Sequence, residues 1–321
     1  MNNFKKIGLT ALAGSLVATS VYAGEMSVAG SASWRISNHA GTDGGKTMAM
    51  GNQLTFTGGG EMDNGMNVSL SFILDQGDNG LSATANATTA AAGAPFDNHS
   101  ITVSSDAMGS ITFAGEGASS AQNTLDTTAA GDIWDNTFAS YTAPSNADAN
   151  KVLTWTLPSV MDGLGVTTSY NFSSAGKEAT IGYALTYTGV EGLSVSYGFG
   201  EVGGNTAGTT GAEVTTMKAS FAFGPITAAM SINDYDITGA SNEEQSSYKI
   251  SYSVSDELSV SYGSETHETV GQTSDEEFDQ ISVSYTTGGL TASVSQTNAD
   301  NVNGATMSEQ QKWNIGLSFA F

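Results

Sequence analysis

The sequence contains no cysteine and only 4 prolines among its 321 residues. Without cysteine, the chain has no disulfide framework, no thiolate metal site and no cysteine nucleophile. Basic residues are also scarce, with 9 lysines and arginines against 32 aspartates and glutamates. This surplus of acid argues against nucleic-acid binding, which requires a positively charged surface. Intrinsic disorder is disfavoured too, because 39% of the residues are hydrophobic and recur in regular patterns.

Long hydrophobic runs are missing as well, and the mean hydropathy is slightly negative, which argues against a bundle of membrane-spanning helices. One apolar stretch, 7–20, follows Lys5 and Lys6 and precedes Val21-Tyr22-Ala23, which suits a cleavage after Ala23. This three-part pattern predicts a secretory signal peptide over 1–23, with a buried N-terminal helix as the alternative. After cleavage, residues 24–321 hold 7 basic and 32 acidic residues, a net charge of −25.

Apolar residues recur at every second position from Gly24 onward. Trp34 and Ile36 share one parity, for example, whereas Ser33 and Arg35 share the other. Because the side chains of a strand point to opposite faces in turn, each such run has one apolar and one polar face. Sixteen runs of this kind predict an all-β chain, with strands near 25–36, 47–59, 65–75, 98–105, 109–116, 151–157, 164–172, 178–188, 192–200, 213–223, 225–235, 246–254, 257–266, 278–287, 289–299 and 309–321.

The connections between these strands alternate in length. Tight connections such as 63–65, 224–225 and 287–288 have the composition of hairpin turns. The intervening connections are mostly longer, and 117–150 is the longest of them. An even number of strands, with short turns at one end and long loops at the other, is typical of a transmembrane β-barrel. We therefore predict a 16-stranded antiparallel barrel over residues 24–321.

The composition of the two faces distinguishes a membrane barrel from a soluble one. The polar faces consist mainly of small residues, and the apolar faces carry no charge away from the strand ends. A charge at the lipid midplane costs about 2–4 kcal/mol, which explains its exclusion. The alternative is a large soluble β protein whose apolar faces form a core. A barrel with this number of strands encloses an aqueous channel.

Three segments resemble the Gram-negative general porins, particularly those of alphaproteobacteria. Residues 52–72 are similar to the second strand, turn and third strand of that family, and 108–116 to the strand that leads into its third external loop. Residues 313–321 form a period-two strand that ends in Phe321, as outer-membrane barrels do. The resemblance implies a homotrimer of barrels in the outer membrane, in contact with lipid and lipopolysaccharide. Each barrel would be a passive pore for small hydrophilic solutes and ions, without a cofactor, and Phe321 would be the assembly signal.

The resemblance also implies that 117–150 is the third external loop, folded into the lumen as a constriction. This segment contains acidic residues and no basic ones, and it includes an aromatic residue suited to anchoring it on the wall. The candidate constriction residues are Asp126, Asp132, Trp134 and Asp135. The alternative is an external loop with solvated acids, since a connection of this length is either functional or disordered.

Four basic residues of the predicted strands have the parity of the polar face. They are Arg35, Lys218, Lys249 and Lys312. We expect Arg35 and Lys312 at similar heights, because the first and last strands must pair. Our hypothesis is a transverse field between these wall cations and the loop acids, which would orient dipolar solutes. The alternative is that the cations only keep the lumen hydrated.

One position departs from the family pattern. Many general porins have Gly-Arg where this chain has Gly115-Glu116. Alternation from Thr112 places Glu116 in the lumen, so an anion replaces a wall cation. Together with the net charge, this substitution predicts a preference for cations.

The remaining polar features carry less information. His39, His99 and His267 lack the spacing of metal ligands, so we expect them to be solvated or to face lipopolysaccharide. Acidic runs such as 275–277 are expected on solvated external loops, where divalent cations are a possible partner without a specific motif. No catalytic spacing indicates an enzyme. A substrate-specific channel and a non-conducting adhesin or surface protein remain the rival interpretations.

Overall fold

The computed structural model describes residues 26–40, 45–75, 98–125, 128–133, 151–172, 179–202, 211–237, 242–304 and 309–321. The predicted signal peptide lies outside these residues, so it stays a prediction. No helix in the described part of the chain is long and apolar enough to cross a membrane.

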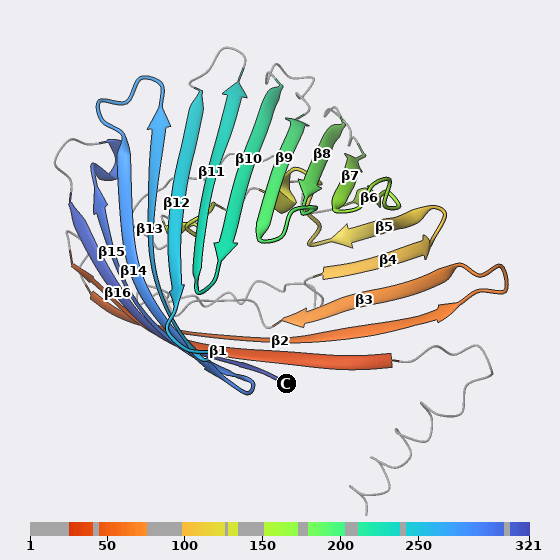
Figure 1. Ribbon diagram of the computed structural model, residues 1–321, viewed down its shortest axis with the longest axis horizontal. Coiled ribbons are helices and arrows are strands. Elements are labelled where there is room, and N and C mark those ends of the chain that lie inside the picture. The colour runs from red at the N-terminus through yellow and green to blue at the C-terminus, as the bar shows by residue number, and fades with distance from the viewer. Residues whose placement is uncertain are drawn as a thin grey trace, which may run out of the picture.

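Sixteen strands account for most of the described residues, and each pairs antiparallel with the strands before and after it. Pairing of the first strand with the last closes the sheet into a barrel, as the sequence predicts (Figure 1). The strands are β1 (Met26–Ala40), β2 (Gly45–Glu61), β3 (Asn67–Asp75), β4 (Asn98–Ser105), β5 (Gly109–Glu116), β6 (Val152–Thr156), β7 (Leu164–Asn171), β8 (Thr180–Tyr187), β9 (Leu193–Val202), β10 (Ala212–Phe223), β11 (Ile226–Ile237), β12 (Glu243–Ser253), β13 (Leu258–Thr269), β14 (Glu276–Thr287), β15 (Leu290–Asp300) and β16 (Gln310–Ala320).

The predicted boundaries hold to within a few residues for most strands. The largest difference is an extension at an end with a long loop, where β1 reaches Ala40, four residues past the predicted end; β2 begins at Gly45, two residues before its predicted start. The first two strands pair without a break from Met26–Gly58 to His39–Gly45. Backbone pairing therefore continues beyond the last apolar residue of these strands. The alternation pattern ends at that residue, so it predicted shorter strands.

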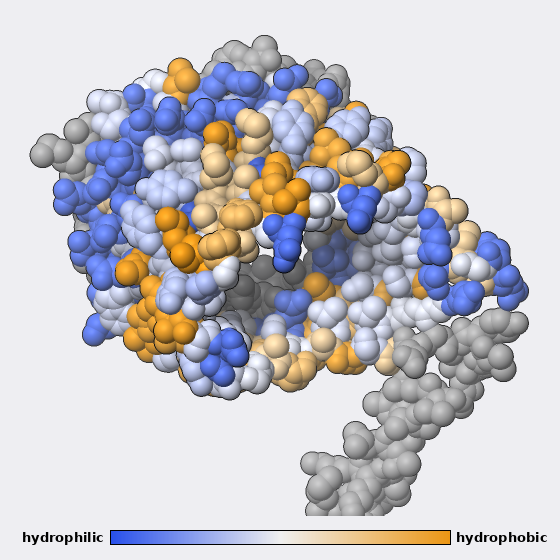
Figure 2. All heavy atoms as spheres, in the orientation of Figure 1, coloured by the Kyte–Doolittle hydropathy of each residue, from blue (hydrophilic) through white to orange (hydrophobic). Residues whose placement is uncertain are grey.

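Alternation along the strands produces an apolar outer face and a polar inner one. Large hydrophobic side chains of a single parity are exposed on each strand, such as Tyr248, Ile250 and Tyr252 on β12. Their neighbours of the opposite parity are mostly small or polar, and on β12 they include the buried Gln245 and Ser247. Figure 2 shows this mixture of apolar and polar patches around a hollow centre. A soluble barrel would bury its large apolar residues, so this arrangement fits a wall facing lipid.

Tight turns at one end of the barrel depend on glycine. Gly109 follows the turn between β4 and β5 with a φ of 75°, a conformation that other residues rarely adopt. A Cβ atom at this position would lie 2.2 Å from the backbone oxygen of Thr156 on β6. Glycine is therefore required both for the turn and for the approach of the neighbouring strand.

The last residue completes the seam between β1 and β16. The amide of Gly30 donates to the carbonyl of Phe321 at 2.7 Å, and the amide of Phe321 donates back at 2.9 Å. The Phe321 ring covers Gly30 so closely that a Cβ there would lie 2.4 Å from it. Phe321 is thus part of the barrel closure, while its predicted role as an assembly signal stays a prediction.

Candidate functional site

Buried polar side chains are concentrated on one part of the inner wall. The buried polar residues of the strands come from β7 to β16, apart from Ser37 on β1. Several of them contact residues 120–125 and 128–133, from the connection between β5 and β6. We call these two pieces the first and second anchors.

The first anchor holds onto β7, β9 and β10. The amide of Ala121 donates to Ser169 Oγ on β7 at 2.7 Å, and Gln122 Nε2 donates to Thr216 Oγ1 on β10 at 2.9 Å. Between these strands, Gly198 on β9 has no side chain, and Leu125 lies over it. A glycine inside a strand often marks such a close approach.

The second anchor crosses β11, β12 and β13 and is held largely through its backbone. The amides of Ala129 and Ala130 donate to Ser231 Oγ on β11 and Ser247 Oγ on β12, at 2.9 and 3.0 Å. On β13, Ala130 lies over Gly263, where an added Cβ would be 2.9 Å from the Ala130 side chain. Serine hydroxyls on the wall thereby satisfy backbone groups that would otherwise be buried without partners.

The turn of the second anchor is organised by Thr128. Its hydroxyl accepts from the amides of Gly131 and Asp132, at 3.1 and 2.7 Å, and donates to the buried carboxylate of Glu265. The Asp132 carboxylate accepts from the amide of Thr128 at 3.0 Å. Asp132 adopts a φ of 52°, so the turn holds its backbone in the left-handed region.

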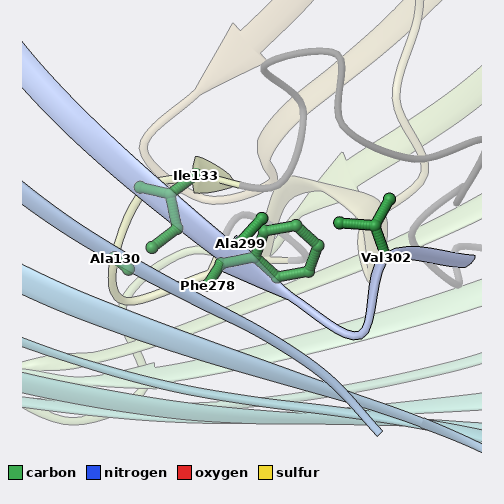
Figure 3. Close-up of a cluster of buried hydrophobic side chains, with 5 residues drawn as sticks. All are labelled: Ala130, Ile133, Phe278, Ala299 and Val302. Carbon is green, nitrogen blue, oxygen red and sulfur yellow. The ribbon is translucent and has the colours of Figure 1, made fainter. Parts of the chain in front are cut away.

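An apolar contact ends the second anchor. Ile133 packs against Phe278 on β14 and Ala299 on β15, in a buried cluster with Ala130 and Val302 (Figure 3). Phe278 points to the inner face, where the other residues of β14 are polar, and it is completely buried. A phenylalanine among the polar inward-facing residues of β14 is the local sequence signal for this packing site. The alternation pattern by itself did not identify it.

The predicted constriction residues are only partly within the described residues. Asp132 is described, and its carboxylate stabilises its own turn by accepting from the Thr128 amide. Asp126, Trp134 and Asp135 lie outside the described residues, so their predicted roles stay predictions.

Two predicted wall cations lie on the strands that hold the anchors. Lys218 shares the inner face of β10 with Thr216, and Lys249 shares that of β12 with Ser247. Lys312 on β16 is buried.

The expectation that Arg35 and Lys312 lie at similar heights is wrong. Strand β1 pairs with β16 so that Arg35 faces Gly316 and His39 faces Lys312, a difference of four residues. The estimate from the strand ends failed because it took Glu25 and Phe321 as level, whereas Phe321 pairs with Gly30. Arg35 is exposed beside small residues of four strands, including Ala49, Gly51, Ser293 and Gly316, which line a recess of about 440 Å³.

The argument that placed Glu116 in the lumen does not hold. Ala114 pairs with Ser100, but Glu116 pairs with His99, so Gly115 is an extra residue on β5. A bulge of this kind interrupts the alternation just before Glu116. The His99 ring lies over Gly115, where a Cβ would be 2.0 Å from it. The parity of Thr112 therefore does not fix the face of Glu116.

Two expectations about solvated groups are also wrong. His267 and Glu276, on β13 and β14, are buried on the inner face, with His267 Nδ1 3.8 Å from Glu276 Oε2. His267 also contacts the Phe278 ring, at 5.1 Å between ring centroids. Both residues lie near looped strand ends, where composition alone suggests exposure, but the second anchor and its surroundings cover them. His99, in contrast, is exposed as expected.

Acidic residues gather on the outer face near the looped ends of β9 to β14. Directly paired residues of like charge include Glu201 with Glu213 and Glu244 with Glu268. Acids of β11 to β13, together with Asp275 just before β14, line a groove of about 300 Å³. No group of three or more potential ligands that could hold a metal ion occurs within the described ranges. A divalent cation at these loops therefore stays a prediction.

Comparison with known proteins places these features in a wider context. A family model described as Gram-negative porin matches residues 8–321. No curated protein matches the chain. Similar solved structures include an anion-selective porin from Comamonas acidovorans, with 13% identity and a TM-score of 0.66, covering 93% of this chain and 100% of that one. OmpF from Salmonella typhi, in complex with daunomycin, has 12% identity and a TM-score of 0.70, covering 93% and 98%. The trimer form of OmpT, an outer membrane protein of Vibrio cholerae, has 12% identity and a TM-score of 0.65, covering 93% and 100%.

Proposed function

This chain belongs to the Gram-negative porin family, whose members are outer-membrane diffusion channels, and from that premise we propose that it is a general, non-enzymatic pore for small hydrophilic solutes and ions. One observation supports this proposal above the others. The closed barrel exposes large apolar side chains outward and keeps polar ones inside, with two anchors of one loop bound to the inner wall.

We propose that 117–150 narrows the pore. The two anchors bind one side of the wall, from β7 to β15, and leave most of the inner face of β1 exposed. A passage between the loop and β1 would carry Asp132 on one side and Arg35 on the other. Facing charges in a narrow passage would orient dipolar solutes and disfavour apolar ones.

We propose a preference for cations on the basis of the net charge. Glu116 does not support this preference, because the bulge at Gly115 means that alternation does not determine whether Glu116 faces the lumen. The predicted mature chain has 32 acidic and 7 basic residues, and Arg35 is its one arginine. A net negative charge raises the local concentration of cations around the protein. The similar porin from Comamonas acidovorans is described as anion-selective, so the fold alone does not set the sign.

We also propose a homotrimer embedded in lipid and lipopolysaccharide. The apolar outer face supports a lipid environment, and a similar structure, OmpT of Vibrio cholerae, is described in a trimer form. The predicted signal peptide over 1–23 supplies the route across the inner membrane.

Planar bilayer recording of the purified protein tests the pore directly. We expect steady ohmic steps that occur in threes, and a reversal potential in a KCl gradient that indicates potassium over chloride. Block by one solute class would instead indicate a substrate-specific channel. A silent but folded barrel would indicate an adhesin or surface protein, and anion preference would overturn the proposed selectivity.

A further inference from the structure

A row of buried polar side chains crosses the inner wall beneath the loop. Strand pairing places Thr216 opposite Asn233, Asn233 opposite Gln245, Gln245 opposite His267, and His267 opposite Glu276. All five are on inner faces of β10 to β14, and none is more than 3% exposed. We call these five residues the polar row.

The polar row connects the two anchors of the loop. At one end, Gln122 of the first anchor donates to Thr216 Oγ1 at 2.9 Å. At the other end, His267 contacts Phe278, which packs against Ile133 of the second anchor. Glu265, two residues from His267 on the same face of β13, accepts from Thr128 of the second anchor. The polar row therefore extends from the attachment of the first anchor to that of the second.

Hydrogen bonds within the row run in one direction and end at His267. Asn233 Nδ2 donates to Gln245 Oε1 at 3.1 Å, which leaves Gln245 Nε2 as a donor toward His267 Nε2, also at 3.1 Å. An amide nitrogen can only donate, so His267 Nε2 must accept and the ring must be neutral, with its proton on Nδ1 toward Glu276. The direction of these hydrogen bonds thus selects the neutral His267 ring with its proton on Nδ1.

We propose that His267 makes the attachment of the loop sensitive to pH, and that acid releases the loop. This inference rests on the proposed function of the barrel as a pore that the loop narrows. A second proton on His267 Nε2 would face the donor Gln245 Nε2, so the amides of Gln245 and Asn233 would have to turn over or separate. Burial also disfavours the charged ring. The neutral ring is therefore the state that holds the loop, and the hold is full at neutral pH and decreases as pH falls.

Charged groups around His267 define what opposes this release. Glu276 on β14, Glu265 on β13 and Asp132 of the second anchor are the carboxylates near the ring, and Glu243 lies two residues from Gln245 on β12. Each would attract a protonated ring. Glu276 Oε2 lies 3.8 Å from His267 Nδ1, which is too far for a hydrogen bond, so Glu276 only partly compensates for the donor that faces Nε2.

Amide hydrogen exchange of peptides covering 128–133 tests the proposal in the folded, full-length barrel. Exchange rates would be corrected for intrinsic chemistry and compared at about pH 7.5 and about pH 5, on either side of the ordinary histidine range. We expect the second anchor to exchange about tenfold faster at the lower pH. This change is the one expected if proton binding weakens the attachment of the loop by a factor equivalent to one pKa unit.

Matched variants separate His267 from the many other acids that titrate. His267→Gln should remove the pH difference, because its side chain stays neutral, whereas the exposed His99→Gln should retain it. Gln245→Glu should reduce or reverse the difference, because a carboxylate would accept from a protonated ring. The proposal would be overturned if the wild-type second anchor exchanged at the same rate at both pH values. It would also be overturned if folded His267→Gln kept the full wild-type difference in exchange rate between the two pH values.

Bilayer recording on the same samples distinguishes this failure from failure of the pore. More frequent closures or current noise at about pH 5 in the wild type, absent in His267→Gln, would support regulation of conduction. Conducting wild-type channels with pH-independent exchange would refute only the proposed release. A silent barrel whose exchange still depends on His267 would refute the pore, and with it any role of His267 in conduction.

Discussion

On β1 the inward-facing Ser31, Ser33 and Arg35 are exposed, whereas on β10 to β13 the inward-facing Thr216, Ser231, Gln245 and Glu265 are buried. Both sets of strands obey the same alternation and use the same small or polar residue types. The difference comes from the two loop anchors, which cover one side of the wall and leave the other open. Polar residues therefore hydrate the passage on one side and hold a loop on the other.

Among single substitutions, Ile133→Ala is expected to have the largest effect on the covered side of the wall. Ile133 is buried against Phe278 and Ala299, so its truncation should cost the second anchor about 2–4 kcal/mol. Exchange of 128–133 should increase strongly while the barrel stays folded. The exposed Val160→Ala, in the turn between β6 and β7, serves as a control without effect. An unchanged rate in Ile133→Ala would show that the apolar contact does not hold the loop.

Gly263→Val should have the next largest effect. Even a Cβ at this position would lie 2.9 Å from the Ala130 side chain, and the branched side chain adds further overlap, for a cost of about 1–3 kcal/mol. Single-channel conductance should become broadly distributed, because the anchor loses one fixed position. Gly165→Val is the matched control on the inner face of β7, since its nearest neighbour is 3.8 Å away. Similar behaviour of the two variants would contradict the assigned seat.

Ser247→Ala should weaken the covered side more gently. It removes the acceptor for the Ala130 amide and the partner of Ser231 Oγ, a loss of about 1 kcal/mol. The same substitution on the open side, Ser33→Ala, should leave thermal stability and exchange unchanged, because Ser33 is exposed. Melting and exchange measurements on both variants compare the two sides with identical chemistry. Equal losses would mean that coverage does not matter.

Arg35→Gln should affect selectivity without affecting stability. The residue is exposed and lies in a recess of small side chains, so its removal leaves no buried partner behind. We expect the permeability ratio of potassium to chloride to rise about 1.5- to 2-fold, because a wall cation that attracts chloride is lost. Lys46→Gln, an exposed cation of outer-face parity on β2, should leave the ratio unchanged. A fall in the ratio for Arg35→Gln would contradict its lumenal placement.

Much of the barrel could be predicted from the sequence, whereas the loop seat could not. Alternation located all sixteen strands and assigned the outer face, because side chains along an uninterrupted strand follow the same two-residue period. The same rule failed at Glu116, where one extra residue interrupts the period, and it could not compare heights across β1 and β16. Ser231, Ser247 and Glu265 were missed, because nothing local distinguishes a wall residue that binds a loop from one that faces water.

The sequence by itself determined the number of strands, their order, the face that meets lipid and the net charge of the chain. Each of these follows from local periodicity or from composition, and neither requires knowledge of distant contacts. Only the tertiary structure decided which part of the wall is covered, where Arg35 and Lys312 lie, and that His267 is buried. These outcomes depend on strand register and on contacts such as Gln122 with Thr216 and Ile133 with Phe278, between residues far apart in the chain.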